Sequence, residues 1–458
     1  MYRPTLRAIT LVLFETCLIV GGVFVAIAIR FSGVDWTLFW SEGGFYKTLL
    51  VAGVTQACLY YADLYNLKLV SDRRELFIRI LQALGAAAFV LALLWYWFGV
   101  LEIGRGVFGI AAAIVISSII GWRFLFDWMS RRVGPRERLL LVGTGPAAVI
   151  LARELYQRKE LGVQIVGFVD PDPAKVGMPV INPGVIGTID DIPAIIQSHN
   201  VDRVVVSLAD ARGKLPMDRL LDMKLNGVTF DHLASVYEEY TGKIAVENLR
   251  PSWFIFSAGF RQTRIIAAAK RLLDIIASVA GLLLAAPIML VVAVLVKLSS
   301  RGPALYNQRR VGQHGRDFTI YKFRTMRTDA EAATGAVWAT AGDTRIFPFG
   351  RLMRRTRLDE LPQLWNVLRG EMSFVGPRPE RPEFVAELTR QIPFYGQRHV
   401  VRPGLTGWAQ VRYTYGASVE DALQKLQYDL FYIKNLSVPL DLYIIFETLK
   451  TVLLRRGA

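Results

Sequence analysis

The sequence predicts a membrane protein that combines an α-helical bundle with α/β structure. Hydrophobic residues make up 53% of the 458 residues, and a mean hydropathy of +0.33 is too apolar for an ordinary soluble protein. Four apolar segments open the chain, and a strand, a glycine turn and a helix follow them. We therefore expect four transmembrane helices, a Rossmann-like parallel α/β domain, and a mainly helical C-terminal domain held on the membrane by a re-entrant hairpin.

The first predicted domain, residues 1–132, contains segments long enough to cross a hydrocarbon core of about 30 Å. These segments are about Ile9–Ile29, Phe45–Tyr65, Phe77–Val100 and Val107–Trp128. The first lacks the small-residue cleavage site of a signal peptide, so we interpret it as a retained helix. Basic residues gather before the first segment, after the second and after the fourth, while the two other loops hold only Arg105. The positive-inside rule therefore predicts that both ends of the bundle are cytoplasmic.

Charge and cysteine content limit the partners. A net charge of +15 favours phosphorylated substrates or lipid headgroups. Nucleic acid is a weaker interpretation, because the arginines are not part of a recognised nucleic-acid-binding motif. Cys17 and Cys58 both lie in apolar segments, which excludes a disulfide framework, and the four histidines show no metal-ligand spacing.

Residues 136–250 form the second predicted domain. Gly143, Gly145 and Ala148 fit the dinucleotide fingerprint, and Asp170 ends the next strand, where a ribose-binding acid would lie. A further strand is expected at 201–208. A lone fingerprint is weak evidence of a ligand, so a rigid spacer or dimerisation domain is the alternative.

The chain turns apolar again at 271–300, with Pro287 in the middle. Basic residues flank both ends of this segment, and a central proline kinks a helix. A fifth membrane span would place the arginine-rich residues that follow outside the cell. We therefore favour a re-entrant hairpin that dips into the inner leaflet.

The arginine-rich stretch Arg351–Glu380 surrounds one acidic pair, Asp359 and Glu360. Pro362 suits a helix start and Gly370 a helix stop, which predicts a helix over about 360–369. A carboxylate at its positive end would stay ionised and nucleophilic, and the same end attracts phosphate. The alternative is that the acidic residues only cap the helix. Neighbouring helical residues point in different directions, so one carboxylate could attack while the other holds a metal ion.

Other basic residues are placed for contacts with phosphate. Lys322 and Arg324 alternate with aromatic residues, a pattern that an ordinary strand with one solvated face also shows. Arg378 lies between two prolines, and Arg402 precedes Pro-Gly. The tail over 438–456, with Lys450, Arg455 and Arg456, is expected to be a helix on the membrane surface.

These motifs together resemble the bacterial sugar transferases, which are monotopic phosphoglycosyl transferases or polyprenyl-phosphate hexose-1-phosphate transferases. The resemblance covers about 264–458 and rests on the hairpin with Pro287, YKFRTM, LDELPQLWNVLRGEMSFVGPRPE, RPGLTGWAQV and YDLFYIKNLS. The four spans and the α/β domain resemble the long form of that family. The family often has serine before the hairpin proline, whereas Ala286 stands here, which should weaken one backbone-capping hydroxyl and leave the kink.

The resemblance implies a two-step reaction at the inner membrane of a bacterium, with the catalytic domain on the cytoplasmic face. Asp359 would attack the β-phosphate of a UDP-sugar, UDP-glucose or UDP-galactose, and release UMP. Undecaprenyl phosphate would then take the sugar phosphate, the first membrane step of exopolysaccharide, capsule or O-antigen synthesis. Glu360 and Asp359 would lie near Mg²⁺, membrane lipids would be partners, and a homodimer is compatible. The expected substrate contacts are Lys322, Arg324, Arg354, Arg357, Arg378, Pro379 and Arg402.

Two other classes remain open. A membrane-bound nucleotide-sugar dehydratase would need a second glycine fingerprint and a Tyr-x-x-x-Lys pair, and no tyrosine here has lysine four residues on. A non-catalytic scaffold for polysaccharide export is the other alternative, and the intact acidic pair argues against it.

Overall fold

The computed structural model describes most of the chain. The described residues are 6–31, 43–62, 64–65, 73–132, 137–157, 162–206, 217–246, 254, 257, 259–260, 263–328, 330, 345–413, 416 and 418–453. They belong to two compact units, Tyr2–Val236 and Tyr237–Ala458. The predicted basic residues Arg3, Lys68, Arg455 and Arg456 lie outside the described residues.

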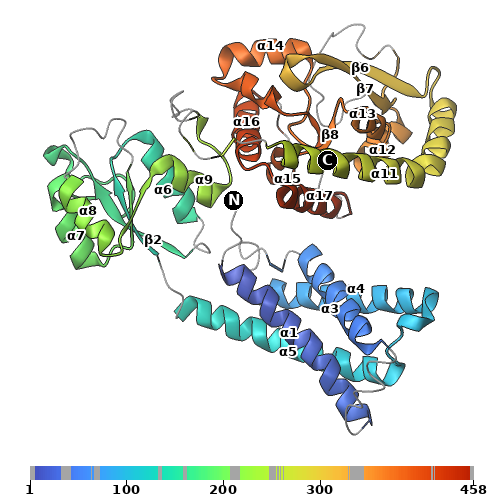
Figure 1. Cartoon of the computed structure of the whole chain (residues 1–458), viewed down its shortest axis with the longest axis horizontal. Helices are drawn as coiled ribbons and strands as arrows, with labels where there is room; N and C mark the ends of the chain where they lie inside the picture. The colour runs from blue at the N-terminus through green and yellow to red at the C-terminus, as the bar shows by residue number, and fades with distance from the viewer. Residues whose placement is uncertain are drawn as a thin grey trace. The chain divides into compact units, whose positions relative to one another are not determined.

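The N-terminal part of the first unit is a helical bundle (Figure 1). Its helices are α1 (Leu6–Phe31), α3 (Gly44–Tyr61), α4 (Arg73–Trp97), the short η1 (Gly99–Leu101) and α5 (Arg105–Arg132). Among the described residues, α1, α4 and α5 each contain a stretch long and apolar enough to cross a membrane. The 18-residue helix α3 is not in this group, since Lys47, Thr48 and Gln56 make it more polar. That α3 spans the membrane stays a prediction.

A buried polar network joins the helices of this bundle. Glu15 on α1 is fully buried and Arg123 on α5 is 3% exposed. Two guanidinium nitrogens of Arg123 donate to the Glu15 carboxylate, Nη2 at 3.0 Å from Oε2. The Leu64 carbonyl accepts from Nη1 of Arg123, and the Tyr65 hydroxyl donates to Glu15 at 2.6 Å. Ionic groups inside a helix bundle persist only when they are paired in this way.

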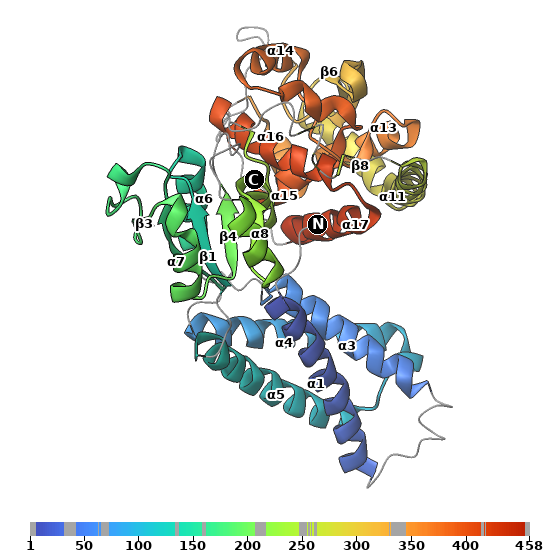
Figure 2. The same cartoon turned by 60° about the vertical axis from the view of Figure 1, so that its left-hand side comes forward.

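The second part of this unit is a five-stranded parallel sheet, as predicted. Its strands lie in the order β3-β2-β1-β4-β5. They are β1 (Glu137–Val142), β2 (Val163–Val169), β3 (Val185–Gly187), β4 (Arg203–Val206) and β5 (Thr229–His232). Helices α7 (Ile192–His199) and α8 (Met217–Leu225) lie on one side, and α6 (Pro146–Gln157) lies on the other (Figures 1 and 2). The apolar residues of α7 pack against buried residues of β1, β2 and β4. This strand order matches the first five strands of the Rossmann order 3-2-1-4-5-6.

The second unit begins within α9 (Leu233–Thr241) and holds the arginine-rich residues. Its long helix is α11 (Arg264–Ser299), and two antiparallel strands, β6 (Leu305–Val311) and β7 (Asp317–Phe323), follow. The remaining elements are η6 (Gln313–Gly315), α12 (Pro348–Thr356), η7 (Leu358–Glu360), α13 (Gln363–Arg369), β8 (Ser373–Val375), α14 (Pro382–Gln391), η8 (Tyr395–Val400), β9 (Gly404–Thr406), α15 (Trp408–Arg412), α16 (Val419–Lys434) and α17 (Val438–Leu453). The core of the unit is built around Trp408, Phe431 and Tyr432. Ile244 and Val246, which follow α9, belong to this core.

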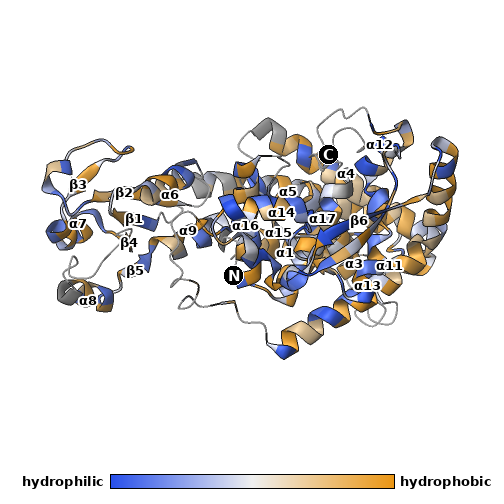
Figure 3. Ribbon diagram, turned by 90° about the horizontal axis from the view of Figure 1, so that it is seen from above, coloured by the Kyte–Doolittle hydropathy of each residue, from blue (hydrophilic) through white to orange (hydrophobic). Residues whose placement is uncertain are grey.

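Helix α11 is assigned as one helix with Pro287 inside it. Its ribbon changes direction along its length, as a proline that breaks the backbone ladder requires (Figure 1). Figure 3 shows it coloured mainly as hydrophobic, in contrast with the hydrophilic strand β6. Ala286 and Pro287 are both exposed. By length and composition α11 could also cross a membrane, so these two properties do not distinguish a hairpin from a span.

Both ends of α11 are held by the same compact fold. Near its start, Arg271 donates to the carbonyls of Val367 and Leu368 at the end of α13, at 2.7 and 2.8 Å. At its end, the carbonyl of Ser300 accepts from Nη2 of Arg324 at 2.7 Å. Strand β7, which precedes Arg324, is fastened to α13 by Asn366, whose amide donates to the Thr319 carbonyl at 2.7 Å. The two ends of α11 are thus attached to neighbouring elements.

Candidate active site

The acidic pair lies in η7, a single turn between α12 and α13. The prediction of one helix over about 360–369 was wrong at its start, because α13 begins at Gln363 and Pro362 is the residue before it. The predicted stop at Gly370 is confirmed, since this residue adopts the left-handed conformation with φ 83°. Arg357, also left-handed with φ 57°, turns the chain between α12 and η7. The acidic pair is therefore placed by a sharp turn and not by a continuous helix.

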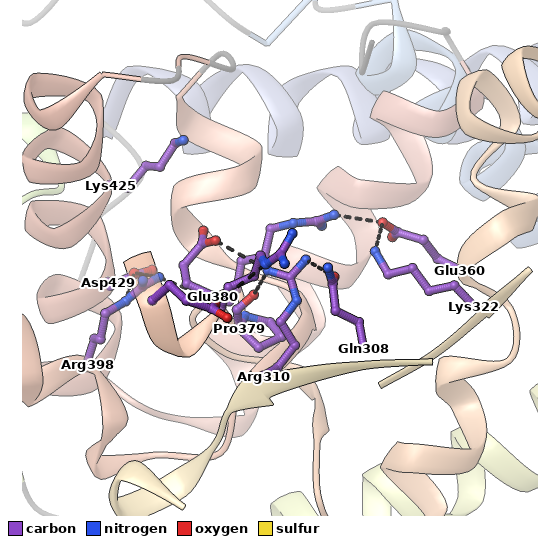
Figure 4. A network of polar contacts seen from close by, with 12 residues as sticks. Gln308, Arg310, Lys322, Glu360, Pro379, Glu380, Arg398, Lys425 and Asp429 are labelled. Atoms are coloured by element: carbon purple, nitrogen blue, oxygen red, sulfur yellow. Dashed lines mark hydrogen bonds and ion pairs between the residues drawn. The ribbon is translucent and has the colours of Figure 1, made fainter. Parts of the chain in front are cut away.

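Three cations from different parts of the chain surround Glu360, which is 9% exposed. Its Oε1 accepts from Arg378 at 2.8 Å and from Arg357 at 3.3 Å, and Lys322 lies 3.6 Å away (Figure 4). Burial by itself would raise the pKa of Glu360, but Arg378, Lys322 and Arg357 outweigh it and hold the pKa well below its ordinary value. Glu360 is therefore a permanently charged centre of this site.

Asp359 behaves differently from its neighbour. Burial and the adjacent charge of Glu360 raise the pKa of Asp359 to about 6, against Lys322, Arg354 and Arg357. A helix dipole therefore does not control this pKa, because desolvation and Glu360 dominate, and the carboxyl ionises less readily than an ordinary aspartate while still being mostly ionised at neutral pH. The Oδ1 atom of Asp359 is buried without a hydrogen-bond partner. Buried acceptors in this state are uncommon, and a catalytic role or a bound ion is one explanation for them.

A small cavity opens beside the cations that contact Glu360, and its charged walls are Lys322, Arg310 and Arg378, with Pro379 beside them. Burial lowers the pKa of Lys322, against the attraction of Glu360. Gln363 also lines the cavity; it is 3% exposed, and its Nε2 has no hydrogen-bond partner. Three cations and an unpaired amide donor around one cavity attract an anionic group with several oxygens, such as a phosphate.

The structure brings together five of the seven predicted contact residues. Lys322, Arg357, Arg378 and Pro379 lie at the acidic pair or the cavity, as described above. Arg354 influences Asp359 electrostatically, and its Nε donates to Thr325 at 2.9 Å. The cluster therefore assembles from β7, the turn after α12, and the loop after β8.

Arg324 and Arg402 do not line this cavity. Arg324 is 3% exposed, and its guanidinium donates to Ser300, to the Pro303 carbonyl and to the Met326 carbonyl. The guanidinium of Arg324 therefore holds the chain at the end of α11 and is not placed to bind phosphate. Arg402 is half-buried and is not among the described residues that line the cavity. Its backbone carbonyl packs closely against Gly376.

Arg310 and Gln363 line the cavity but were not among the substrate contacts predicted from the sequence. Gln363 stood inside the quoted motif LDELPQLW, but nothing in the sequence shows that its side chain faces a cavity. Arg310 lies on β6 directly after Gln308 and Arg309, and the pairing of β6 with β7 brings it to the same cavity as Lys322. In the described residues, no group of three or more His, Cys, Asp or Glu side chains is placed to hold a metal ion.

The weakly predicted nucleotide site lies in the sheet of the first unit. Gly143 follows β1 with φ 102°, Gly145 precedes α6, and Asp170 follows β2, as expected. The Asp170 carboxylate already accepts hydrogen bonds from Thr144, Lys175 and the backbone of Asp172. These donors outweigh burial and lower its pKa. The acid expected to bind a ribose is therefore occupied by the protein's own groups.

Comparisons with known proteins bear on both units. The family described as "Bacterial sugar transferase" matches residues 265–455. The family described as "CoA-binding domain" matches residues 61–216. The first match contains the acidic pair and every wall of the cavity.

Three curated relatives resemble the chain. The UDP-N-acetylgalactosamine-undecaprenyl-phosphate N-acetylgalactosaminephosphotransferase of Aeromonas hydrophila is 44% identical, over 50% of this chain and 53% of the relative. The UDP-glucose:undecaprenyl-phosphate glucose-1-phosphate transferase of Xanthomonas campestris pv. campestris is 36% identical, over 70% and 68%. The undecaprenyl-phosphate glucose phosphotransferase of Komagataeibacter xylinus is 32% identical, over 90% and 78%. This chain thus spans about half the length of the first relative and more than two thirds of the other two.

Proposed function

This chain belongs to the bacterial sugar transferase family and is an undecaprenyl-phosphate sugar phosphotransferase, and we propose that it transfers a sugar 1-phosphate from a UDP-sugar and releases UMP. The observation that carries the proposal is the buried, unpartnered Oδ1 of Asp359 next to Glu360, whose partners Lys322 and Arg378 line a cationic cavity. An oxygen nucleophile next to fixed positive charge suits displacement at phosphorus, which needs charge neutralisation and positioning more than proton transfer.

The proposed reaction has two displacements at one phosphorus atom. A carboxylate oxygen of Asp359 attacks the β-phosphorus of the donor, the bond from that phosphorus to the bridging oxygen breaks, and UMP leaves. A phosphate oxygen of undecaprenyl phosphate then attacks the same phosphorus, and the bond to Asp359 breaks. The products are undecaprenyl-diphosphate-sugar and the free carboxylate, so no proton has to be moved.

The residues around the pair have separate parts in this scheme. Lys322 and Arg378 line the cavity and would balance the charge of the donor phosphates. Glu360, which they also contact, keeps these cations gathered in one place before the donor binds. Asp359, with its pKa at about 6, is mostly ionised at neutral pH and ready to attack.

The family implies Mg²⁺, and the residues fit it. The cations that contact Glu360 all use Oε1, so the described contacts leave Oε2 of Glu360 and Oδ1 of Asp359 to hold the ion. Mg²⁺ commonly takes one or two carboxylates and completes its shell with water and substrate phosphate. When bound it would neutralise charge on the phosphates.

We expect chelation to remove the activity. Excess EDTA should stop UMP release, and Mg²⁺ should restore it, since two carboxylates alone hold the ion weakly. Thermal unfolding should change little, because the ion joins only two neighbouring residues. Full activity of metal-free enzyme, verified by elemental analysis, would contradict the Mg²⁺ assignment.

We also propose that α11 enters and leaves the membrane on the cytoplasmic face of the inner membrane. Its two ends are attached to neighbouring parts of one fold through Arg271 and Arg324. A spanning helix would put these attachments on opposite sides of the membrane. The mostly exposed apolar residues between them suit contact with lipid, since only 17% of the most apolar window is buried.

Cysteine accessibility tests this topology. In a chain without Cys17 and Cys58, Arg264→Cys and Arg301→Cys mark the two exposed ends of α11. We expect a membrane-impermeant maleimide to label neither in intact spheroplasts and both in inverted vesicles. Labelling of one end from each side would mean that α11 spans the membrane.

The proposed function is tested by finding which UDP-sugar the enzyme accepts and which nucleotide it releases. Purified enzyme with Mg²⁺ and undecaprenyl phosphate would receive UDP-glucose, UDP-galactose, UDP-N-acetylglucosamine and UDP-N-acetylgalactosamine in turn. We expect UMP from one of them, and we propose UDP-glucose or UDP-galactose, although one relative's name specifies N-acetylgalactosamine. UDP as product would indicate ordinary glycosyl transfer, and no nucleotide from any donor would favour a scaffold.

A further inference from the structure

The turn Pro377–Glu380 carries Arg378, the cation nearest to Glu360. Two of its four residues are prolines, which have no backbone N–H. Arg378 and Pro379 line the first cavity and also a second one. The position of this turn therefore determines the shape of both cavities, and its carbonyl groups are the main points at which the fold can hold it.

All four carbonyls of the turn accept a hydrogen bond. The Pro377 carbonyl accepts from the N–H of Gly404 at 2.9 Å, and the Glu380 carbonyl accepts from the N–H of Val311 at 3.0 Å. Between them, the Arg378 carbonyl accepts from Nη2 of Arg398 at 3.0 Å, and the Pro379 carbonyl accepts from Nη1 of Arg310 at 3.2 Å. The first bond needs a close backbone approach, since a Cβ on Gly404 would lie 2.1 Å from the nitrogen of Gly376. The middle two bonds come from side chains of distant segments. The side chains of Arg398 and Arg310, and not the neighbouring backbone, therefore hold the carbonyls of Arg378 and Pro379.

Arg398 is itself held on every side. It is 5% exposed, and its Nε and Nη2 donate to Oδ2 of Asp429 at 3.1 and 2.8 Å. Its Nη1 donates to the Tyr395 hydroxyl at 2.6 Å. Asp429 on α16 is 2% exposed, so the pair is shielded from water. A rigid, planar guanidinium can reach these partners and the Arg378 carbonyl together, whereas an ammonium cannot.

Figure 4 shows the sequence of contacts. Arg398 and Asp429 lie at one side, Lys322 and Glu360 lie at the other, and Arg310, Pro379 and Glu380 lie between them. Resting on the proposed function, we propose that Arg398, fixed by Asp429 and Tyr395, is a positioning residue that holds the Pro377–Glu380 turn so that Arg378 meets Glu360 and the donor phosphates. Arg398 does not contact Glu360, so its effect on the reaction passes through Arg378.

A double-mutant cycle with Arg378 tests this route. Arg398→Lys should lower kcat for UMP release by about 10- to 100-fold with little change in KM, because a small misplacement of a charge-balancing group costs that much. In an Arg378→Ala background, the same Arg398→Lys change should lower kcat by less than about threefold. Full multiplication of the two effects would overturn the proposal.

A matched control separates positioning from general stability. Arg203 pairs with Asp231 at 2.7 Å in the α/β sheet and is also largely buried. Arg203→Lys should lower the thermal midpoint and leave kcat unchanged. If Arg398→Lys does not fold, Asp429→Asn is the second variant, since it keeps the shape and one acceptor. Asp429→Asn should also lower kcat when Arg378 is present and should lower it much less in the Arg378→Ala background.

Hydrogen exchange gives a readout that does not need the reaction. The peptide over 373–381 should exchange faster in Arg398→Lys and should not change in Arg203→Lys. Unchanged exchange in Arg398→Lys would overturn the positioning role, whatever the activity. Absence of UMP from the wild-type enzyme, with the exchange result as expected, would instead overturn the proposed function and limit Arg398 to holding the turn.

Discussion

Asp359→Asn is expected to lower UMP release by on the order of 10³-fold or more. Asparagine keeps the size of the side chain in a site where Asp359 is only 7% exposed. It loses the negative oxygen that would attack phosphorus, so neither displacement can begin. The measurement is UMP formation by purified protein with Mg²⁺, undecaprenyl phosphate and the active UDP-sugar.

The same variant tests for a covalent intermediate. Without acceptor lipid, wild-type enzyme should release about one UMP per active site in a rapid burst, and Asp359→Asn should release none. Glu383→Gln is the matched control, because this carboxylate is 63% exposed on α14, pairs only loosely with Arg381 at 3.6 Å, and should keep wild-type activity. Substantial turnover by Asp359→Asn would contradict the role of Asp359 as nucleophile.

Arg123→Met is expected to destabilise the helical bundle by about 3–5 kcal/mol, because it leaves the Glu15 carboxylate buried without its main partner. The thermal midpoint should fall by roughly 6 to 20 °C. A thiol-reactive dye that reacts with half-buried Cys58 as the bundle opens can follow the transition in detergent. Exposed Cys17 would first be replaced by serine.

Two further variants make this prediction specific. Glu15→Gln together with Arg123→Met removes both charges and keeps an acceptor for Tyr65, so it should recover much of the lost stability. Arg30→Met, which changes an exposed arginine of the same bundle, should have little effect. A double variant less stable than Arg123→Met alone would mean that the charges do not act as a pair.

Much of the architecture was predictable from local patterns. The apolar segments predicted the helices of the bundle, because any stretch of that length and composition must be removed from water. The glycine turn after an apolar strand predicted β1, α6 and the position of Asp170. The acidic pair was found because it stands in a stretch with six arginines, Arg351–Glu380, that resembles a motif of a known family. The start of α13 was misplaced by a few residues, since a proline fits either a first turn or the residue before it.

The sequence by itself determined which chemical groups the site contains, because Asp359, Glu360 and the arginines around them are fixed by their order in the chain. Only the tertiary structure decided how these groups differ. In the fold, Arg378 contacts Glu360 whereas Arg324 donates to Ser300 at the end of α11, although both arginines stand in basic motifs of similar appearance. The fold also raised the pKa of Asp359 while lowering that of its neighbour. The physical reason is that burial and charge pairing depend on which distant segments pack together, and a spacing of residues along the chain does not contain that information.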